Sequence, residues 1–266
     1  MVEPLFRRLT WEEVNGRVRE GRVILLPVGA IEQHGPHLPV DTDNVAVARV
    51  CTEAASRAPD LLLCLPTVHY GFNEQGLDFP GTISVTEDHF IGYCYDVCAS
   101  VARMGFKKIL VVNGHGGNVP FLEIVVRLIT ARTGSVAALV NWWDLAADAI
   151  ARLRESPHPG AIDHAGEVET SVYLACDPGM VKRDRLTREV PSVRGRWFWG
   201  GASGFGAVRM MNVASRITTG GTFGDPTHSS AEKGGQMLQA AVENLIDLAR
   251  EFRDLPIQPR VSHLLP

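Results

Sequence analysis

The stretch Val23-Ile-Leu-Leu-Pro-Val28 is continuously apolar and runs into the polar loop Gly29-Ala-Ile-Glu-Gln-His-Gly-Pro-His-Leu-Pro-Val-Asp-Thr-Asp43. A short apolar run that stops at a glycine predicts a strand buried on both faces, as in parallel sheets covered by helices. The loop carries five His, Asp or Glu residues, which are costly to bury unless they bind something. In extended backbone Glu32 and His34 share one face. The loop therefore predicts a divalent-cation site.

Three further apolar runs indicate buried strands, at 61–65, 109–112 and 136–140. Segments with helical spacing separate them, and the first, 10–21, opens with the capping box Thr10-Trp-Glu-Glu13. The others span 43–58, 86–105, 119–132, about 144–155 and about 229–252. This alternation predicts an α/β fold with a mostly parallel sheet covered on both faces, in a single domain over 1–266.

Composition excludes several function classes. The chain of 266 residues has 45% hydrophobic and 21% charged residues and a net charge of -4, so it lacks the basic surface expected of a nucleic-acid or membrane binder. The N-terminal residues lack the apolar core of a signal peptide, and no apolar run is long enough to span a bilayer. The five cysteines lie in apolar segments and are expected to be reduced. We expect a cytoplasmic protein with neither nucleic-acid nor membrane partners.

Polar side chains recur where each predicted strand ends. Glu32, His34 and Asp43 follow the first strand, and the later strands are followed by His69 and Tyr70, by His115, and by Trp143. The carboxyl ends of parallel strands form one edge of the sheet, where ligands bind in open α/β folds. We therefore expect these side chains to gather around one site.

His115 lies in the glycine-rich segment Asn113-Gly-His-Gly-Gly-Asn118. Its backbone N–H groups could cradle a phosphate, although the segment lacks the order of a P-loop or a dinucleotide site. A single loop histidine can also simply be a hydrogen-bonded polar residue. Because the flanking glycines clear the space around it and a second cluster is predicted at the same edge, we favour His115 as a metal ligand.

The segment Asp163-His-Ala-Gly-Glu-Val-Glu-Thr-Ser171 opens another predicted helix. Glu167 and Glu169 in its first turn could merely complement the helix dipole. That dipole disfavours a cationic His164, so we expect a neutral imidazole suited to acid–base work.

Together these motifs resemble the creatininase (creatinine amidohydrolase) family over about residues 20–240. The resemblance is carried by Glu32-Gln-His34-Gly-Pro-His-Leu-Pro, Asn113-Gly-His115, Trp143-Asp144, His164-Ala-Gly-Glu-Val-Glu169-Thr-Ser171, Phe79-Pro-Gly-Thr-Ile-Ser84 and Ser230-Ala-Glu-Lys-Gly234. It implies a three-layer α/β/α sandwich, a cytoplasmic homo-oligomer, expected to be a hexamer, and two divalent ions. By position, Glu32, Asp43 and His115 would hold one ion, His34 and Asp43 the other, and His164 would be catalytic.

This chain departs from creatininase itself at informative positions. Creatininase has a tyrosine and a metal-binding glutamate where this chain has Gly116 and Gly117, and a lid tryptophan where it has Gly160. We assign Glu167 as the replacement metal ligand in preference to Glu169, which then lies near the metal as a second candidate for acid–base catalysis. Trp143, His69, Tyr70, Gly116 and Gly117 are predicted to line the substrate site. These departures place the chain in a non-classical branch and make creatinine a doubtful substrate.

The function predicted by the resemblance is hydrolysis of a non-peptide C–N bond, in an amide, cyclic amide or formamide, by water activated between two ions. The ions would be zinc, manganese or iron, and the partner a small-molecule amide. Two alternatives stay open, a peptidase that trims a short peptide and a noncatalytic metal-binding protein with the same fold.

Overall fold

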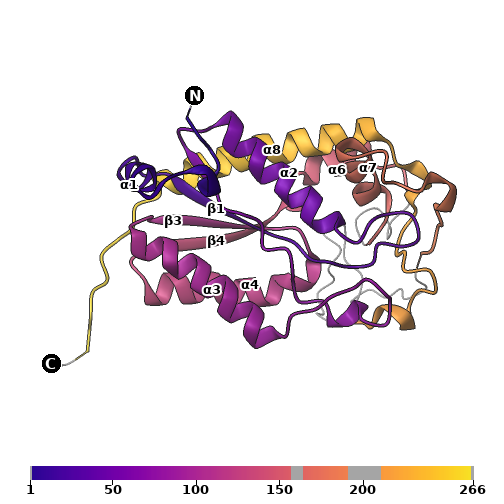
Figure 1. Ribbon diagram of the computed structural model, residues 1–266, viewed down its shortest axis with the longest axis horizontal. Coiled ribbons are helices and arrows are strands. Elements are labelled where there is room, and N and C mark those ends of the chain that lie inside the picture. The colour runs from indigo at the N-terminus through magenta and orange to yellow at the C-terminus, as the bar shows by residue number, and fades with distance from the viewer. Residues whose placement is uncertain (1, 157–163, 191–210, 265–266) are drawn as a thin grey trace.

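The computed structural model describes residues 2–156, 164–190 and 211–264. Its centre is a four-stranded parallel sheet in the order β2-β1-β3-β4 (Figure 1). The strands are β1 (Val23–Val28), β2 (Leu62–Cys64), β3 (Lys108–Asn113) and β4 (Val136–Asn141). The apolar runs therefore predicted the strands and their parallel pairing correctly.

Helices cover both faces of the sheet, as predicted. Figure 1 shows α2, α6, α7 and α8 on one side of the strands and α3 and α4 on the other. The α-helices are α1 (Trp11–Arg19), α2 (Thr42–Arg57), α3 (Glu87–Met104), α4 (Val119–Arg132), α5 (Trp142–Leu145), α6 (Ala147–Leu153), α7 (Glu167–Cys176) and α8 (Ala231–Asp254). Short 3-10 helices are η1 (Phe6–Arg8), η2 (Glu74–Gly76), η3 (Gly116–Asn118), η4 (Arg183–Arg185), η5 (Ala214–Arg216) and η6 (Pro226–His228).

The strands divide the core into two halves because successive side chains point to opposite faces. In β1, Val23 and Leu25 pack with α2, α7 and α8, whereas Ile24 and Leu26 pack with α3 and α4. All four side chains are fully buried. This is the three-layer α/β/α arrangement, and it explains why the strand sequences are apolar at every position.

The predicted capping box is confirmed. Thr10 begins α1 with a capping box, in which its hydroxyl accepts from the Glu13 backbone and the Glu13 carboxylate accepts from the Thr10 backbone. The pattern over 144–155 corresponds to α6, preceded by the short α5. In the described part of the chain, no helix combines the length and apolarity that a membrane crossing requires.

Gly234 allows α7 and α8 to pack closely. A Cβ built on Gly234 would lie 1.9 Å from the carbonyl oxygen of Ser171 in α7, whereas one on Gly235 would meet nothing within 4 Å. We expect Gly234→Ala to destabilise the protein by about 1–3 kcal/mol through overpacking. Gly235→Ala is the matched control and should be neutral or stabilising by up to about 1 kcal/mol. Urea unfolding of both variants tests this, and equal midpoints would contradict it.

Candidate metal centre

The sheet brings the predicted site residues to one edge. Val28 at the end of β1 pairs with Asn113 at the end of β3, so the loops that follow start side by side. The first loop carries Glu32 and His34 and leads into α2, whose first turn contains Asp43. His115 follows β3 directly. Residues 164–169, which lead into the first turn of α7, complete the site from a part of the chain more than 45 positions after His115.

Asp43 lies between two histidines. Nδ1 of His115 is 3.0 Å from Asp43 Oδ2 and 3.1 Å from Glu32 Oε2. Nε2 of His34 is 3.3 Å from Asp43 Oδ1 and 3.6 Å from Glu169 Oε2. The two oxygens of one carboxylate therefore face two different imidazoles, each accompanied by a further carboxylate.

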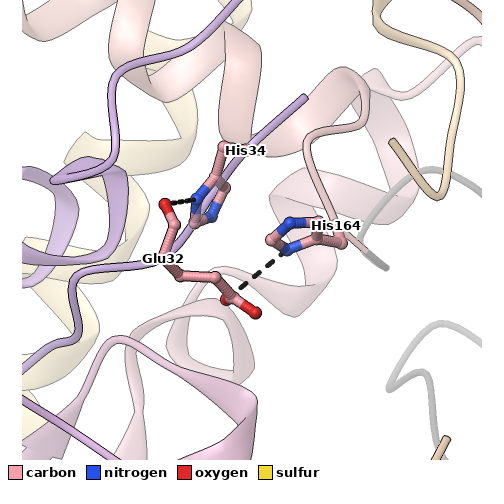
Figure 2. Close-up of side chains that lie close together, drawn as sticks. All are labelled: Glu32, His34 and His164. Atoms are coloured by element: carbon pink, nitrogen blue, oxygen red, sulfur yellow. Dashed lines mark hydrogen bonds and ion pairs between the residues drawn. The ribbon is translucent and has the colours of Figure 1, made fainter. Parts of the chain in front are cut away.

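His164 faces the same cluster from the segment just before α7. Its Nδ1 is 3.7 Å from Glu32 Oε2, and its ring centre is 4.2 Å from that of His34 (Figure 2). Its Nε2 lies 2.6 Å from the Gln33 carbonyl oxygen, which can only accept a hydrogen bond. The Gln33 side-chain nitrogen also lies 3.0 Å from Nε2, but it donates to the Gly221 carbonyl. The shorter contact directs the Nε2 proton at the Gln33 carbonyl, which leaves Nδ1 as a free base aimed at the cluster.

The donor set fits divalent cations. His34 Nε2 and Asp43 Oδ2 are buried and make no hydrogen bond, although each lies within 3.3 Å of an oppositely charged or basic atom. These nitrogen and oxygen atoms are close together but are not oriented for a hydrogen bond. Such an arrangement is expected when the lone pairs of both atoms point at the same metal ion. Three groups of possible ligands meet here, Glu32–Asp43–His115, His34–Asp43–Glu169 and Glu32–His34–His164. Carboxylate and imidazole ligands without thiolate are typical of zinc, manganese and iron sites.

The pKa values reflect this crowding of charges. Burial raises the pKa of Glu169 to about 7, against the opposing effect of His34. Burial alone would lower the pKa of His34, but the carboxylates of Asp43 and Glu169 raise it to about 10. Burial would raise the pKa of Asp43, yet His34 and His115 hold it below its usual range. Protons thus balance the buried carboxylates, and a metal ion would take their place on binding.

The pKa of His164 is shifted in the opposite direction. Burial lowers it to about 4, and the nearby carboxylate of Glu32 offsets this only in part. The imidazole is therefore neutral near pH 7, which agrees with the argument from the helix dipole.

The prediction that Glu167 supplies the replacement carboxylate disagrees with the structure. Glu167 is fully buried, but its oxygens accept from Lys233 Nζ at 2.6 Å and from the backbone of Glu155 and Ser156. It belongs to none of the three ligand groups found in the described residues. With every oxygen engaged by other donors, Glu167 anchors α7 to α8, and Glu169 instead faces the cluster.

The predicted substrate-binding residues are less tightly gathered. His69 and Tyr70 are exposed on the loop after β2. Gly116 and Gly117 form the turn η3 directly beside His115. Trp143 lies in α5, half-buried against the core formed by α2, α7 and α8. Contact of these residues with a substrate stays a prediction, and Gly160 lies outside the described residues.

Two glutamines beside the cluster were missed by the sequence argument. Gln33 is buried, and its amide accepts from the Gly35 N–H and donates to the Gly221 carbonyl. The Gln75 amide lies 3.2 Å from Nε2 of His115. Neither residue titrates, so a search for candidate ligands passes over both. The position of Gln33 between Glu32 and His34 was the available signal.

Known proteins share this sequence and this fold. The creatininase family model, described as creatinine amidohydrolase, matches residues 7–249. The creatinine amidohydrolase of Pseudomonas putida is 31% identical over 259 residues, which cover 91% of this chain and 95% of that protein. The mycofactocin precursor peptide peptidase of Mycobacterium tuberculosis is 31% identical over 236 residues, covering 84% and 82%.

Solved structures agree with the sequence comparisons. A manganese form of creatininase superposes with a TM-score of 0.79 at 29% identity and covers 95% of this chain and 100% of that one. A creatininase variant of the Zn–Zn type gives a TM-score of 0.79 at 29% identity, covering 95% and 99%. The match of the family model over nearly the whole length, together with this superposition, shows that the chain belongs to the creatininase family.

Proposed function

We propose that this protein is a metal-dependent amidohydrolase that cleaves a C–N bond with two divalent ions per chain. The observation that carries the proposal is the position of Asp43, whose two carboxylate oxygens face His115 and His34 separately. Glu32, Asp43 and His115 would hold one ion, and His34, Asp43 and Glu169 the other. Zinc and manganese occur in the related creatininase structures, and iron suits the same ligands.

The bound ions would supply Lewis acidity, which lowers the pKa of water and polarises a carbonyl group. The chain's own contribution is a positioned base. His164 is neutral, its Nε2–H is directed at the Gln33 carbonyl, and its Nδ1 faces Glu32 at the edge of the cluster. Nδ1 can therefore take a proton from the attacking water and pass it to the leaving nitrogen. With Glu169 ionised as a ligand, this role falls to His164 alone.

The substrate we propose is a small non-peptide amide, cyclic amide or formamide. A peptide substrate is the second candidate, because the chain is 31% identical to a peptide peptidase over 236 residues and 31% identical to a creatinine amidohydrolase over 259 residues. A noncatalytic metal-binding role is the third candidate. The free Nδ1 of His164 argues against it, because a protein that only holds metal would not need this base.

A substrate screen with the metal-reconstituted protein tests the proposed function. Creatinine, cyclic ureides and imides, formamides and short peptides are each incubated with zinc-, manganese- or iron-loaded enzyme, and release of the amine or ring opening is followed. We expect hydrolysis of at least one non-peptide amide, abolished by a chelator and restored by the metal. Hydrolysis of peptides alone would favour the peptidase, and turnover that resists the chelator would overturn the metal mechanism.

We further propose that the chain acts in the cytoplasm as a homo-oligomer, with a hexamer as the expected form. Exposed apolar side chains at Tyr70, Leu77 and Ile83, on the segment between β2 and α3, support a contact with another copy. Light scattering during size-exclusion chromatography should give about six times the mass of one chain.

A further inference from the structure

We propose that Gln75 is a positioning residue that holds His115 in the tautomer required for metal binding through Nδ1. This inference rests on the proposed function, because it concerns how one ligand of the proposed metal centre is prepared. Gln75 lies in η2 (Glu74–Gly76), on the segment between β2 and α3, and is separated from His115 by 40 positions. The Gln75 side chain is uncharged and belongs to none of the possible ligand groups among the described residues, so its role depends on hydrogen-bond geometry.

The two ring nitrogens of His115 have different surroundings. Nδ1 faces Glu32 and Asp43 at 3.1 and 3.0 Å, and Nε2 lies 3.2 Å from the amide nitrogen of Gln75. A neutral imidazole carries one proton, and the nitrogen that binds a metal must be the other one. A metal ion held by Nδ1 with Glu32 and Asp43 therefore requires the proton on Nε2. That N–H is buried and needs an acceptor.

Gln75 can provide this acceptor. Its Oε1 is buried and has no hydrogen-bond partner, whereas its Nε2 points at His115. The oxygen and nitrogen of a side-chain amide have nearly the same shape, and their placement is decided by the hydrogen bonds they make. Turning the amide by 180° brings Oε1 to the Nε2–H of His115, so that this oxygen and this N–H satisfy each other, and moves the amide nitrogen to the position that Oε1 held. Without this turn, the amide donates to an imidazole that is protonated on Nδ1.

Gly117 gives Gln75 the space to reach His115. A Cβ on Gly117 would lie 2.5 Å from His115 Nε2, 2.7 Å from Gln75 Nε2 and 2.8 Å from the carbonyl oxygen of Phe72. Any side chain at this position would therefore push between the histidine and the amide. The glycine at position 117 thus has a structural reason that is independent of phosphate binding.

The test uses the full-length protein and cobalt(II), whose visible absorption reports both ligand geometry and binding. Gln75→Leu removes the acceptor at similar size, Gln75→Glu keeps an acceptor, and Gln239→Leu on the exposed side of α8 is the matched control. Each protein is titrated with cobalt(II) against a competing chelator. Loss of a hydrogen-bond partner of a metal-bound histidine typically costs about 10–100-fold in metal affinity.

We expect Gln75→Leu to bind one of the two cobalt(II) ions, the one held by His115, about 10–100-fold less tightly and with a changed absorption spectrum. Gln75→Glu and Gln239→Leu should keep the affinity and spectrum of the unaltered protein. Equal affinity in Gln75→Leu, or an equal loss in Gln75→Glu, would overturn the role of Gln75. If the unaltered protein binds no cobalt(II), the proposed function fails and not merely this inference.

Discussion

Replacing Asp43 by alanine should prevent the protein from holding either metal ion and should reduce hydrolysis to the rate without metal. Asp43 is the one carboxylate in the described cluster that faces both His34 and His115, so its loss weakens both proposed sites together. The affinity should fall by more than the roughly 10–100-fold expected for a residue that only supports a ligand. Metal content after dialysis and turnover of the best substrate measure the two effects.

Asp41→Ala is the matched control for this experiment. Asp41 lies two positions earlier, and its carboxylate accepts a hydrogen bond from the Tyr173 hydroxyl at 3.0 Å. It belongs to none of the possible ligand groups among the described residues. Metal content should therefore be unchanged. An Asp43→Ala protein that is folded and retains two ions per chain would contradict the bridging role.

Replacing His164 by alanine should lower the turnover number about 10²–10⁴-fold while the metal content stays the same. The reason is that His164 faces the cluster through a free Nδ1 but is needed, in this account, for proton transfer and not for holding an ion. His89→Ala, on the exposed first turn of α3, should behave like the unaltered protein. Turnover and metal content are measured on the same samples.

Two outcomes would contradict this role for His164. Unchanged hydrolysis would show that the proton is carried by another group. Loss of one metal ion would show that His164 is a ligand, as the group Glu32–His34–His164 allows. In that case the proposed ligand role of Glu169 would have to be reconsidered.

Much of the site was predictable because parallel strands gather the loops that follow them. Glu32, His34, Asp43 and His115 lie just after apolar runs whose burial and direction the sequence indicates, and the sheet brings those loops together. No knowledge of distant packing was needed for these four residues. His164 follows no predicted strand, and its place at the site came from the resemblance to the creatininase family.

The position of Glu169, and not Glu167, at the cluster has a different origin. Residues two apart on a helix point about 200° apart, so the rotation of α7 decides which carboxylate meets the cluster. That rotation follows from the close contact of Gly234 with Ser171, four residues after Glu167 and on the same helix face. Lys233, 66 positions from Glu167, then pairs with it. Contacts this distant in sequence are not visible in a local motif.

The face of α7 that carries Glu169 packs against the loop after β1, whereas the Glu167 face packs against α8. Thr170 bonds His37 and Tyr173 bonds Asp41, so this face lies along the first loop. Tyr173 is four residues after Glu169, and the two side chains therefore share a direction. These hydrogen bonds hold α7 against the loop that contains Glu32 and His34. This position of α7 explains why Glu169 reaches His34.

Metal analysis of the purified protein tests the central claim most directly. The chain is stripped with a chelator, reconstituted separately with zinc, manganese and iron, dialysed, and analysed for metal per folded chain alongside amide hydrolysis. We predict about two ions per chain with at least one metal, and hydrolysis that appears only with the bound ions. No bound metal after reconstitution, or hydrolysis by the metal-free chain at the same rate, would contradict the account.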